Sequence, residues 1–169
     1  MVFERTSQIV SSKLGTLGIT IPHKLCRTFV TETWVNERAK KVFLNPKDSK
    51  SKMLANQTRQ HLLLHELGHI FVHRFINIHL RKNPEFVELF GDFSKFYRRK
   101  FARIKISRDF ISTYAQVHPE DNFCEVFAVY CAHEGKIRKV YKHLKKSKKS
   151  ATVRKQAYWI HKFVRELRQ

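Results

Sequence analysis

A histidine-rich stretch of the chain has the residue types and the spacing needed to hold a metal ion. The sequence HLLLHELGHIFVHR begins at His61 and repeats a histidine every fourth position, at His65, His69 and His73. Residues four apart in an α-helix lie one turn apart on the same side, so His65 and His69 could bind one zinc ion together. Glu66 is rotated by about 100° from His65 and could reach a zinc-bound water without ligating the metal. This H-E-x-x-H pattern predicts a metal-assisted hydrolytic site.

The same stretch fits a buried helix. Apolar residues recur with a helical period over residues 56–77, without an internal proline, and they lie nearly all round the helix. Unpaired buried charge is costly, so the ionisable HELGH residues need a compensating partner, and a metal ion supplies one. The alternative is a core histidine pair satisfied by hydrogen bonds. The two outer histidines lie a turn too far along the axis for the same ion, and we expect them to be partly exposed or hydrogen-bonded.

A third metal ligand must come from elsewhere in the chain, because a catalytic zinc ion usually has three protein ligands and one water. The metzincin arrangement is excluded, since its glycine and histidine would fall at Val72 and Phe75. One acidic helix start lies downstream, in YAQVHPEDNFCEVFAVY, which begins at Tyr114. Pro119 fits the first position of that helix, with His118 as the expected cap.

HELGH followed further along by ISTYAQVHPEDNFCEVFAVY resembles the gluzincin group of zinc metallopeptidases, which includes the catalytic domain of anthrax lethal factor. The resemblance covers about residues 62–130 and is confined to these two motifs. It implies an α+β, zincin-like domain, with a small mixed sheet packed on the HExxH helix and a mostly helical C-terminal half. It also implies Zn²⁺ as the cofactor and a peptide or protein as the substrate.

The resemblance assigns roles to single residues. His65 and His69 match the zinc ligands, and Glu66 matches the general base that activates a zinc-bound water. Tyr114 matches a tyrosine that stabilises the oxyanion. The predicted function is therefore a zinc-dependent metallopeptidase that hydrolyses peptide bonds.

Counting seven residues on from Tyr114, the resemblance places the third ligand at Asp121, and four residues further it places an orienting acid at Glu125. The family usually has glutamate at the first position, and aspartate is one methylene shorter. Either the helix lies closer here, or the neighbouring Glu120 is the third ligand. Asp121 and Glu125 are four apart and share a helix face, so one could bind metal while the other holds a ligating imidazole. An ordinary solvated first turn is the alternative for this pair.

The other elements expected from the sequence surround these two helices. We expect a helix over residues 3–14, strands at ITIP (19–22), 28–37 and KKVFLNP (40–46), one or two helices in NPEFVELFGDFSKFYRRKFARI (83–104), and two helices around the KKSKKS linker (145–150). We divide the chain into a metallopeptidase domain, 1–135, and a basic helical extension, 136–169, packed on or appended to it.

The charge of the chain points to a second kind of partner. With 34 Lys and Arg against 14 Asp and Glu the net charge is +20, which attracts polyanions such as nucleic acid or an acidic surface. Residues 136–169 carry many of these cations, and simple solubility is the alternative explanation. The competing function is a basic nucleic-acid-binding protein with a structural or inactive zinc site, which would use Tyr141, Tyr158 and Trp159 as well as the lysines.

The sequence has no run of eighteen apolar residues, so we expect no transmembrane segment. It also lacks the pattern of a secretory signal, and we expect a cytoplasmic protein, with delivery elsewhere left open. Cys26, Cys124 and Cys131 have no framework spacing and are expected to be reduced, small, buried groups.

Overall fold

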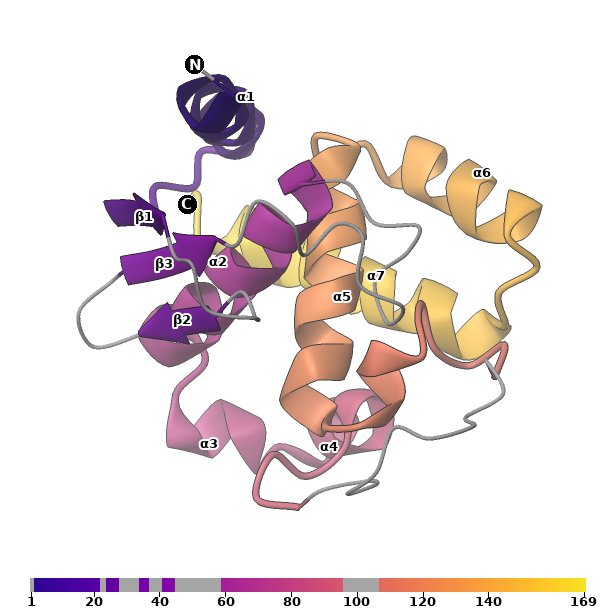
Figure 1. Ribbon diagram of the computed structural model, residues 1–169. Helices are drawn as coiled ribbons and strands as arrows, with labels where there is room; N and C mark the ends of the chain where they lie inside the picture. The colour runs from indigo at the N-terminus through magenta and orange to yellow at the C-terminus, as the bar shows by residue number, and fades with distance from the viewer. Residues whose placement is uncertain (1, 22–23, 28–33, 37–40, 45–58, 96–106) are drawn as a thin grey trace.

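The computed structural model describes residues 2–21, 24–27, 34–36, 41–44, 59–95 and 107–169 (Figure 1). In chain order the elements are α1 (Val2–Thr16), β1 (Lys24–Arg27), β2 (Trp34–Asn36), β3 (Lys41–Leu44), α2 (Arg59–Phe75), α3 (Ile78–Arg81), α4 (Pro84–Phe90), the 3₁₀ helix η2 (Tyr114–Gln116), α5 (Pro119–Ala132), α6 (Ile137–Lys146) and α7 (Ala151–Glu166). Helices α2 and α5 pack directly against each other and form the centre of the fold.

The histidine-rich segment forms α2, as its apolar period predicts. Residues 56–58 of the expected helix lie outside the described residues. The helix ends at Phe75 and not at residue 77, because Asn77 already caps α3 by accepting the Leu80 N–H at 2.9 Å. The fully buried apolar side chains of α2 are Leu63, Leu64, Leu67, Phe71 and Val72. Helix α2 is therefore a core helix, and its polar residues lie at a buried interface.

Helix α5 begins where the sequence predicts. Pro119 lies in its first turn, and Nδ1 of His118 caps it by accepting the backbone N–H of Glu120 at 3.1 Å. This capping satisfies one of the amide groups that a helix start leaves without a partner. Beyond its first turn α5 is buried, and the rings of Phe123 and Phe127 are fully enclosed. The acidic first turn carries the less buried carboxylates of α5, Glu120 and Asp121, whereas Glu125 is a fully buried carboxylate further along the helix.

The two central helices approach most closely at Gly68. A Cβ atom placed on Gly68 would lie 3.0 Å from Sγ, 3.1 Å from Cα and 3.1 Å from Cβ of Cys124. Such contacts are shorter than ordinary van der Waals separations of about 3.5–4.0 Å. The glycine of HELGH therefore lets the backbone of α5 come close enough to place the acidic turn over the histidines of α2.

A small sheet lies against α2. Its order is β1-β3-β2, with β1 parallel and β2 antiparallel to β3, and both β2 and β3 contact α2. Strand β2 falls inside the strand expected over residues 28–37, whose other residues lie outside the described ones, and β3 falls inside KKVFLNP. The strand expected at ITIP is wrong for residues 19–21, since Ile19 and Ile21 are buried on a connection without regular secondary structure, and Pro22 lies outside the described residues. Strand β1 starts only at Lys24.

The expected α+β, zincin-like class requires correction, because helices dominate the described residues. The three strands have only four, three and four residues, and the hydrophobic core of the described side chains is built by helices and their short connections. Among the described residues the sheet is therefore small beside the helices. The described fold is predominantly helical, with a small mixed sheet beside α2.

The C-terminal residues form two helices around a linker, as predicted, and α7 is part of the core. Helix α6 ends at Lys146 and α7 begins at Ala151. Helix α7 packs on α4 and α5, and the indole of Trp159 lies edge-on to the rings of Phe86 and Phe90, at 5.1 and 5.7 Å between ring centroids. Removing residues 136–169 would therefore expose the core. The division of the chain at residue 135 stays a prediction.

Two further expectations concern cysteines and membranes. Cys124 and Cys131 are free thiols and fully buried, which confirms the packing role expected for them, whereas the side chain of Cys26 lies outside the described residues. None of the helices in the described part of the chain combines the length and the apolar character that crossing a bilayer requires.

Candidate metal centre

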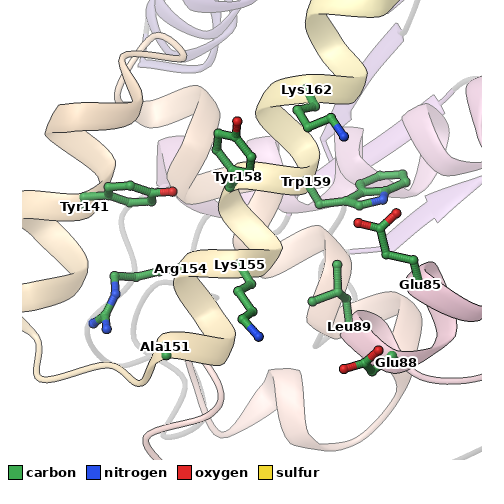
Figure 2. Close-up of a pocket in the computed structure, with 10 residues that line it drawn as sticks. All are labelled: Glu85, Glu88, Leu89, Tyr141, Ala151, Arg154, Lys155, Tyr158, Trp159 and Lys162. Atoms are coloured by element: carbon green, nitrogen blue, oxygen red, sulfur yellow. The ribbon is translucent and has the colours of Figure 1, made fainter.

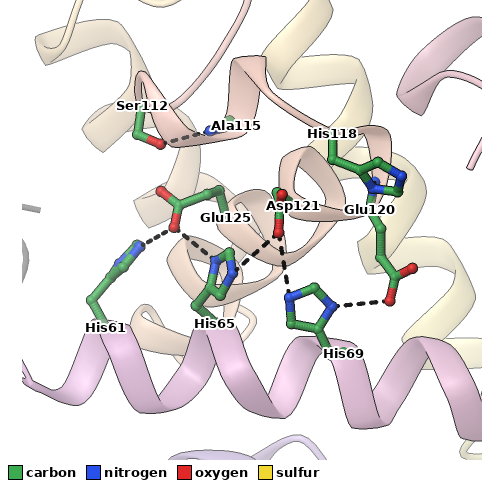
Figure 3. Close-up of polar contacts among 9 residues, drawn as sticks. All are labelled: His61, His65, His69, Ser112, Ala115, His118, Glu120, Asp121 and Glu125. Atoms are coloured by element: carbon green, nitrogen blue, oxygen red, sulfur yellow. Dashed lines mark hydrogen bonds and ion pairs between the residues drawn. The ribbon is translucent and has the colours of Figure 1, made fainter. Parts of the chain in front are cut away.

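The histidines of α2 and the acids of α5 meet at the interface of these helices (Figure 3). On the α2 side, His65 is 3% exposed, the His69 side chain is 16% exposed, and His73 at the end of the series is exposed. On the α5 side, Asp121 is positioned between the two inner imidazoles. Its Oδ1 lies 3.7 Å from Nε2 of His65 and 3.4 Å from Nε2 of His69.

These three residues form a cluster with the geometry of a metal site. Their ligand atoms all lie within 4.8 Å of one another. A tetrahedral zinc ion bound about 2.0–2.1 Å from each donor requires donor separations of about 3.3 Å, close to the distances from Asp121. The buried Nε2 of His65 has no hydrogen-bond partner, although buried polar atoms are normally paired. Two imidazole nitrogens and a carboxylate oxygen are a donor set that zinc accepts, so the residues fit this metal.

The other nitrogen of each histidine is held by a different carboxylate. Nδ1 of His65 lies 2.8 Å from Oε1 of the fully buried Glu125. Nδ1 of His69 lies 2.9 Å from Oε1 of Glu120. An Nδ1–H that donates to a carboxylate fixes the ring orientation and leaves Nε2 for the metal. Glu120 thus contacts His69 at the nitrogen that does not face Asp121, which favours Asp121 over Glu120 as the third ligand.

The outer histidine His61 belongs to the same network. Its Nε2 lies 3.3 Å from the Glu125 oxygen that also contacts His65, so one buried carboxylate oxygen bridges two successive turns of α2. The structure thereby confirms the hydrogen-bonded alternative for His61. The sequence did not indicate which group it would contact, and neither did it indicate that Glu120 contacts His69. The acidic spacing Glu120–Asp121–Glu125 was the available signal, because it places three carboxylates near one end of α5.

The pKa values of the histidines and carboxylates in this cluster are shifted far from their usual ranges. Burial lowers the pKa of His65, but the carboxylates of Asp121 and Glu125 outweigh it and raise this pKa to about 9. Burial raises the pKa of Asp121, but the neighbouring imidazoles outweigh it and bring this pKa to about 2. The pKa of Glu125 lies below its usual range for the same reason, against the opposing effect of burial. The carboxylates are therefore ionised and attract positive charge, either two protons on the histidines or a divalent cation.

Two further residues border the cluster. The ring of Tyr114, on η2, lies 5.3 Å from the ring of His65 between centroids. Burial raises the pKa of Tyr114 well above its usual range, and the carboxylates of Asp121 and Glu66 act in the same direction. The phenol therefore keeps its proton at neutral pH and can donate a hydrogen bond. Glu66 follows His65 on α2 and is 8% exposed, and its negative charge contributes to the raised pKa of Tyr114.

The HELGH motif of α2 and the acidic motif of α5 both lie in the part of the chain that matches one family of proteins. The family model described as "Putative zinc-binding metallo-peptidase" matches residues 23–165, which is most of the chain. The chain belongs to this family. The match supports a zinc-binding metallopeptidase with a peptide or protein substrate, and it spans both the HELGH helix and the acidic helix of this metallopeptidase-family protein. Comparison with curated proteins found no match, and comparison with solved structures found none.

Proposed function

We propose that the protein is a zinc-dependent peptidase whose metal ligands are His65, His69 and Asp121. The observation that carries the proposal is the cluster of three ligand atoms, in which the buried Nε2 of His65 makes no hydrogen bond and faces Asp121 Oδ1 at 3.7 Å. Zinc bound there would lower the pKa of a water toward about 7 and polarise a peptide carbonyl. The gluzincin resemblance is part of this proposal and supports the same three positions.

The residues of the chain would then share the chemistry as follows. The carboxylate of Glu66 accepts the proton of the attacking water and passes it to the leaving amine. The Tyr114 phenol donates a hydrogen bond to the developing oxyanion, a role that its raised pKa supports. Glu125 and Glu120 orient the two ligand histidines and stabilise their tautomers through the Nδ1 contacts.

The test separates metal binding from peptide hydrolysis. Zinc-loaded wild type and Glu66→Gln are incubated with a peptide library, and new chain ends are identified by mass spectrometry. Glu66→Gln should bind zinc like the wild type but cleave at least about 100-fold more slowly, because its general base is lost. Glu166→Gln, on an exposed position of α7, is the matched control and should cleave normally.

Two results would contradict the proposal. Cleavage that persists in Glu66→Gln would mean that this carboxylate is not the base. A zinc-loaded wild type that cleaves no peptide of the library would favour a zinc site without hydrolytic activity.

A further inference from the structure

A concave site lies between α4, α6 and α7, outside the metal cluster (Figure 2). Its volume is about 560 Å³, within the range of about 300–1,000 Å³ that is typical of ligand pockets. Glu85 and Glu88 of α4 form one wall. The residues of α6 and α7 that line the rest of this groove, which we call the α4–α7 groove, are Tyr141, Ala151, Arg154, Lys155, Tyr158, Trp159 and Lys162.

The lysines and arginines on the α6–α7 side of the groove form no ion pairs with carboxylates of the described residues. In the part of the chain that the structure describes, no lysine or arginine of α6 or α7 lies within 4.0 Å of a carboxylate. The exposed cations of these helices and of the linker between them are Arg138, Lys139, Lys142, Lys145, Lys146, Lys148, Lys155, Lys162 and Arg165. The positive potential of these exposed lysines and arginines attracts a polyanion, and their side chains can contact phosphates.

Aromatic rings lie among these cations. Tyr158 of α7 is 50% exposed, and Tyr141 of α6 lines the same groove. In Figure 2 Arg154 lies below the two rings, and Lys155 points away from them toward Leu89. An exposed ring beside cations can bind an unpaired base and its phosphates, because every base offers a face for stacking. Tyr158 is the exposed ring of this groove, whereas Tyr141 is half-buried and Trp159 is buried.

We propose that the α4–α7 groove binds a single strand of nucleic acid. The phosphates lie along α7, on Lys155 and Lys162, and a base stacks on the ring of Tyr158. Glu85 and Glu88 repel phosphates and so confine the sugar-phosphate backbone to the α7 side of the groove. The proposal is independent of the peptidase chemistry, since none of these residues belongs to the metal centre.

Other polyanions fit the groove less well. A duplex keeps its bases paired and stacked, so the ring of Tyr158 would have no base face to contact. An acidic membrane would use the exposed lysines, but the only large apolar side chains exposed among the described residues are Ile78, Tyr158 and Leu167, and they come from different elements. An acidic protein would have no use for the aromatic rings beyond ordinary packing.

The experiment measures the binding of labelled oligo-dT and oligo-U of about 12 nucleotides to the full chain by fluorescence anisotropy. Tyr158→Ala should weaken binding by about 10-fold or more, whereas Tyr158→Phe keeps the ring and should bind like the wild type. The double variant Lys155→Ala/Lys162→Ala should weaken binding and lower the slope of log affinity against log salt by about 1.4. Arg5→Ala/Arg74→Ala removes the same charge at exposed positions outside the groove and is the matched control.

The control should lose less than about threefold, because it removes only long-range attraction. Glu66→Gln should bind the oligonucleotides normally, so failure of this proposal and failure of the peptidase proposal can be told apart. Equal losses in both double variants would overturn the proposal, as would unchanged binding in Tyr158→Ala. Duplex DNA, anionic vesicles or polyglutamate that bound as tightly as the single strands would also overturn it, in favour of a general polyanion surface.

Discussion

The substitution Gly68→Ala tests whether the close contact between α2 and α5 builds the metal site. The added methyl would lie 3.0–3.1 Å from three atoms of Cys124, one of them the backbone Cα, so a rotamer change of Cys124 cannot relieve the contact. Helix α5 must shift by a few tenths of an ångström. Overpacking of this kind costs about 1–3 kcal/mol, and the higher helix propensity of alanine offsets about 1 kcal/mol. We expect a net loss of about 1 kcal/mol in the free energy of unfolding.

The same shift should weaken zinc binding. Gly68 precedes His69 and Cys124 precedes Glu125, so moving α5 away separates the histidines from the carboxylates. Metal–ligand distances tolerate changes of only about 0.2 Å, and we expect zinc affinity to fall at least about 10-fold. Gly15→Ala is the control, because nothing lies within 4 Å of a Cβ at Gly15 on α1, and it should stabilise the protein by up to about 1 kcal/mol.

Both variants would be measured by urea unfolding of the zinc-free protein and by zinc titration against a competing chelator. A drop of about 1 kcal/mol corresponds to about 2–4 °C in Tm for a chain of this size. A Gly68→Ala protein with the stability and the zinc affinity of the wild type would refute the reasoning. It would show that α5 can move without disturbing the cluster.

Three further predictions concern the groups around the metal. Glu125→Gln should weaken zinc binding by about 10–100-fold in a chelator competition, because it removes the charge that orients His65, and an unchanged affinity would exclude that role. The pKa of His65 is raised to about 9, so below that pH zinc must displace a proton from this imidazole. Zinc affinity should therefore rise with pH up to about 9. A zinc affinity that does not change between pH 6 and 9 would contradict this prediction. Tyr114→Phe should lower kcat by about 10²–10³ without changing zinc affinity, and full activity would remove the phenol from the mechanism.

The sequence predicts correctly the elements that depend on local periodicity and helix capping. The spacing of His65 and His69 on a buried helix, the Pro119 start of α5 with its His118 cap, and the linker between α6 and α7 all follow from periodicity and capping. The same rules predicted a strand at ITIP (19–22), which is wrong for residues 19–21, because two isoleucines with a period of two can also pack on the core from an irregular connection.

What the sequence could not indicate depends on how distant segments approach each other. Nothing in the local pattern says that Gly68 faces Cys124, and this contact decides which carboxylate meets which imidazole. For that reason Asp121 and Glu120 could not be separated from the sequence, whereas the structure places them at different nitrogens of His69. The predominance of helices also depends on packing between distant segments. Helix α7 lies in a stretch that the sequence predicts as a basic extension, yet its apolar residues complete the core.

The zinc content of purified protein tests the central claim most directly. Wild type and Asp121→Ala would be compared by elemental analysis after exposure to zinc and removal of the excess. Asp109→Ala, which removes an exposed aspartate, is the control. We expect about one zinc per chain in the wild type and in the control, and little or none in Asp121→Ala. A wild type that retains no zinc, or an Asp121→Ala variant that retains as much as the wild type, would contradict it.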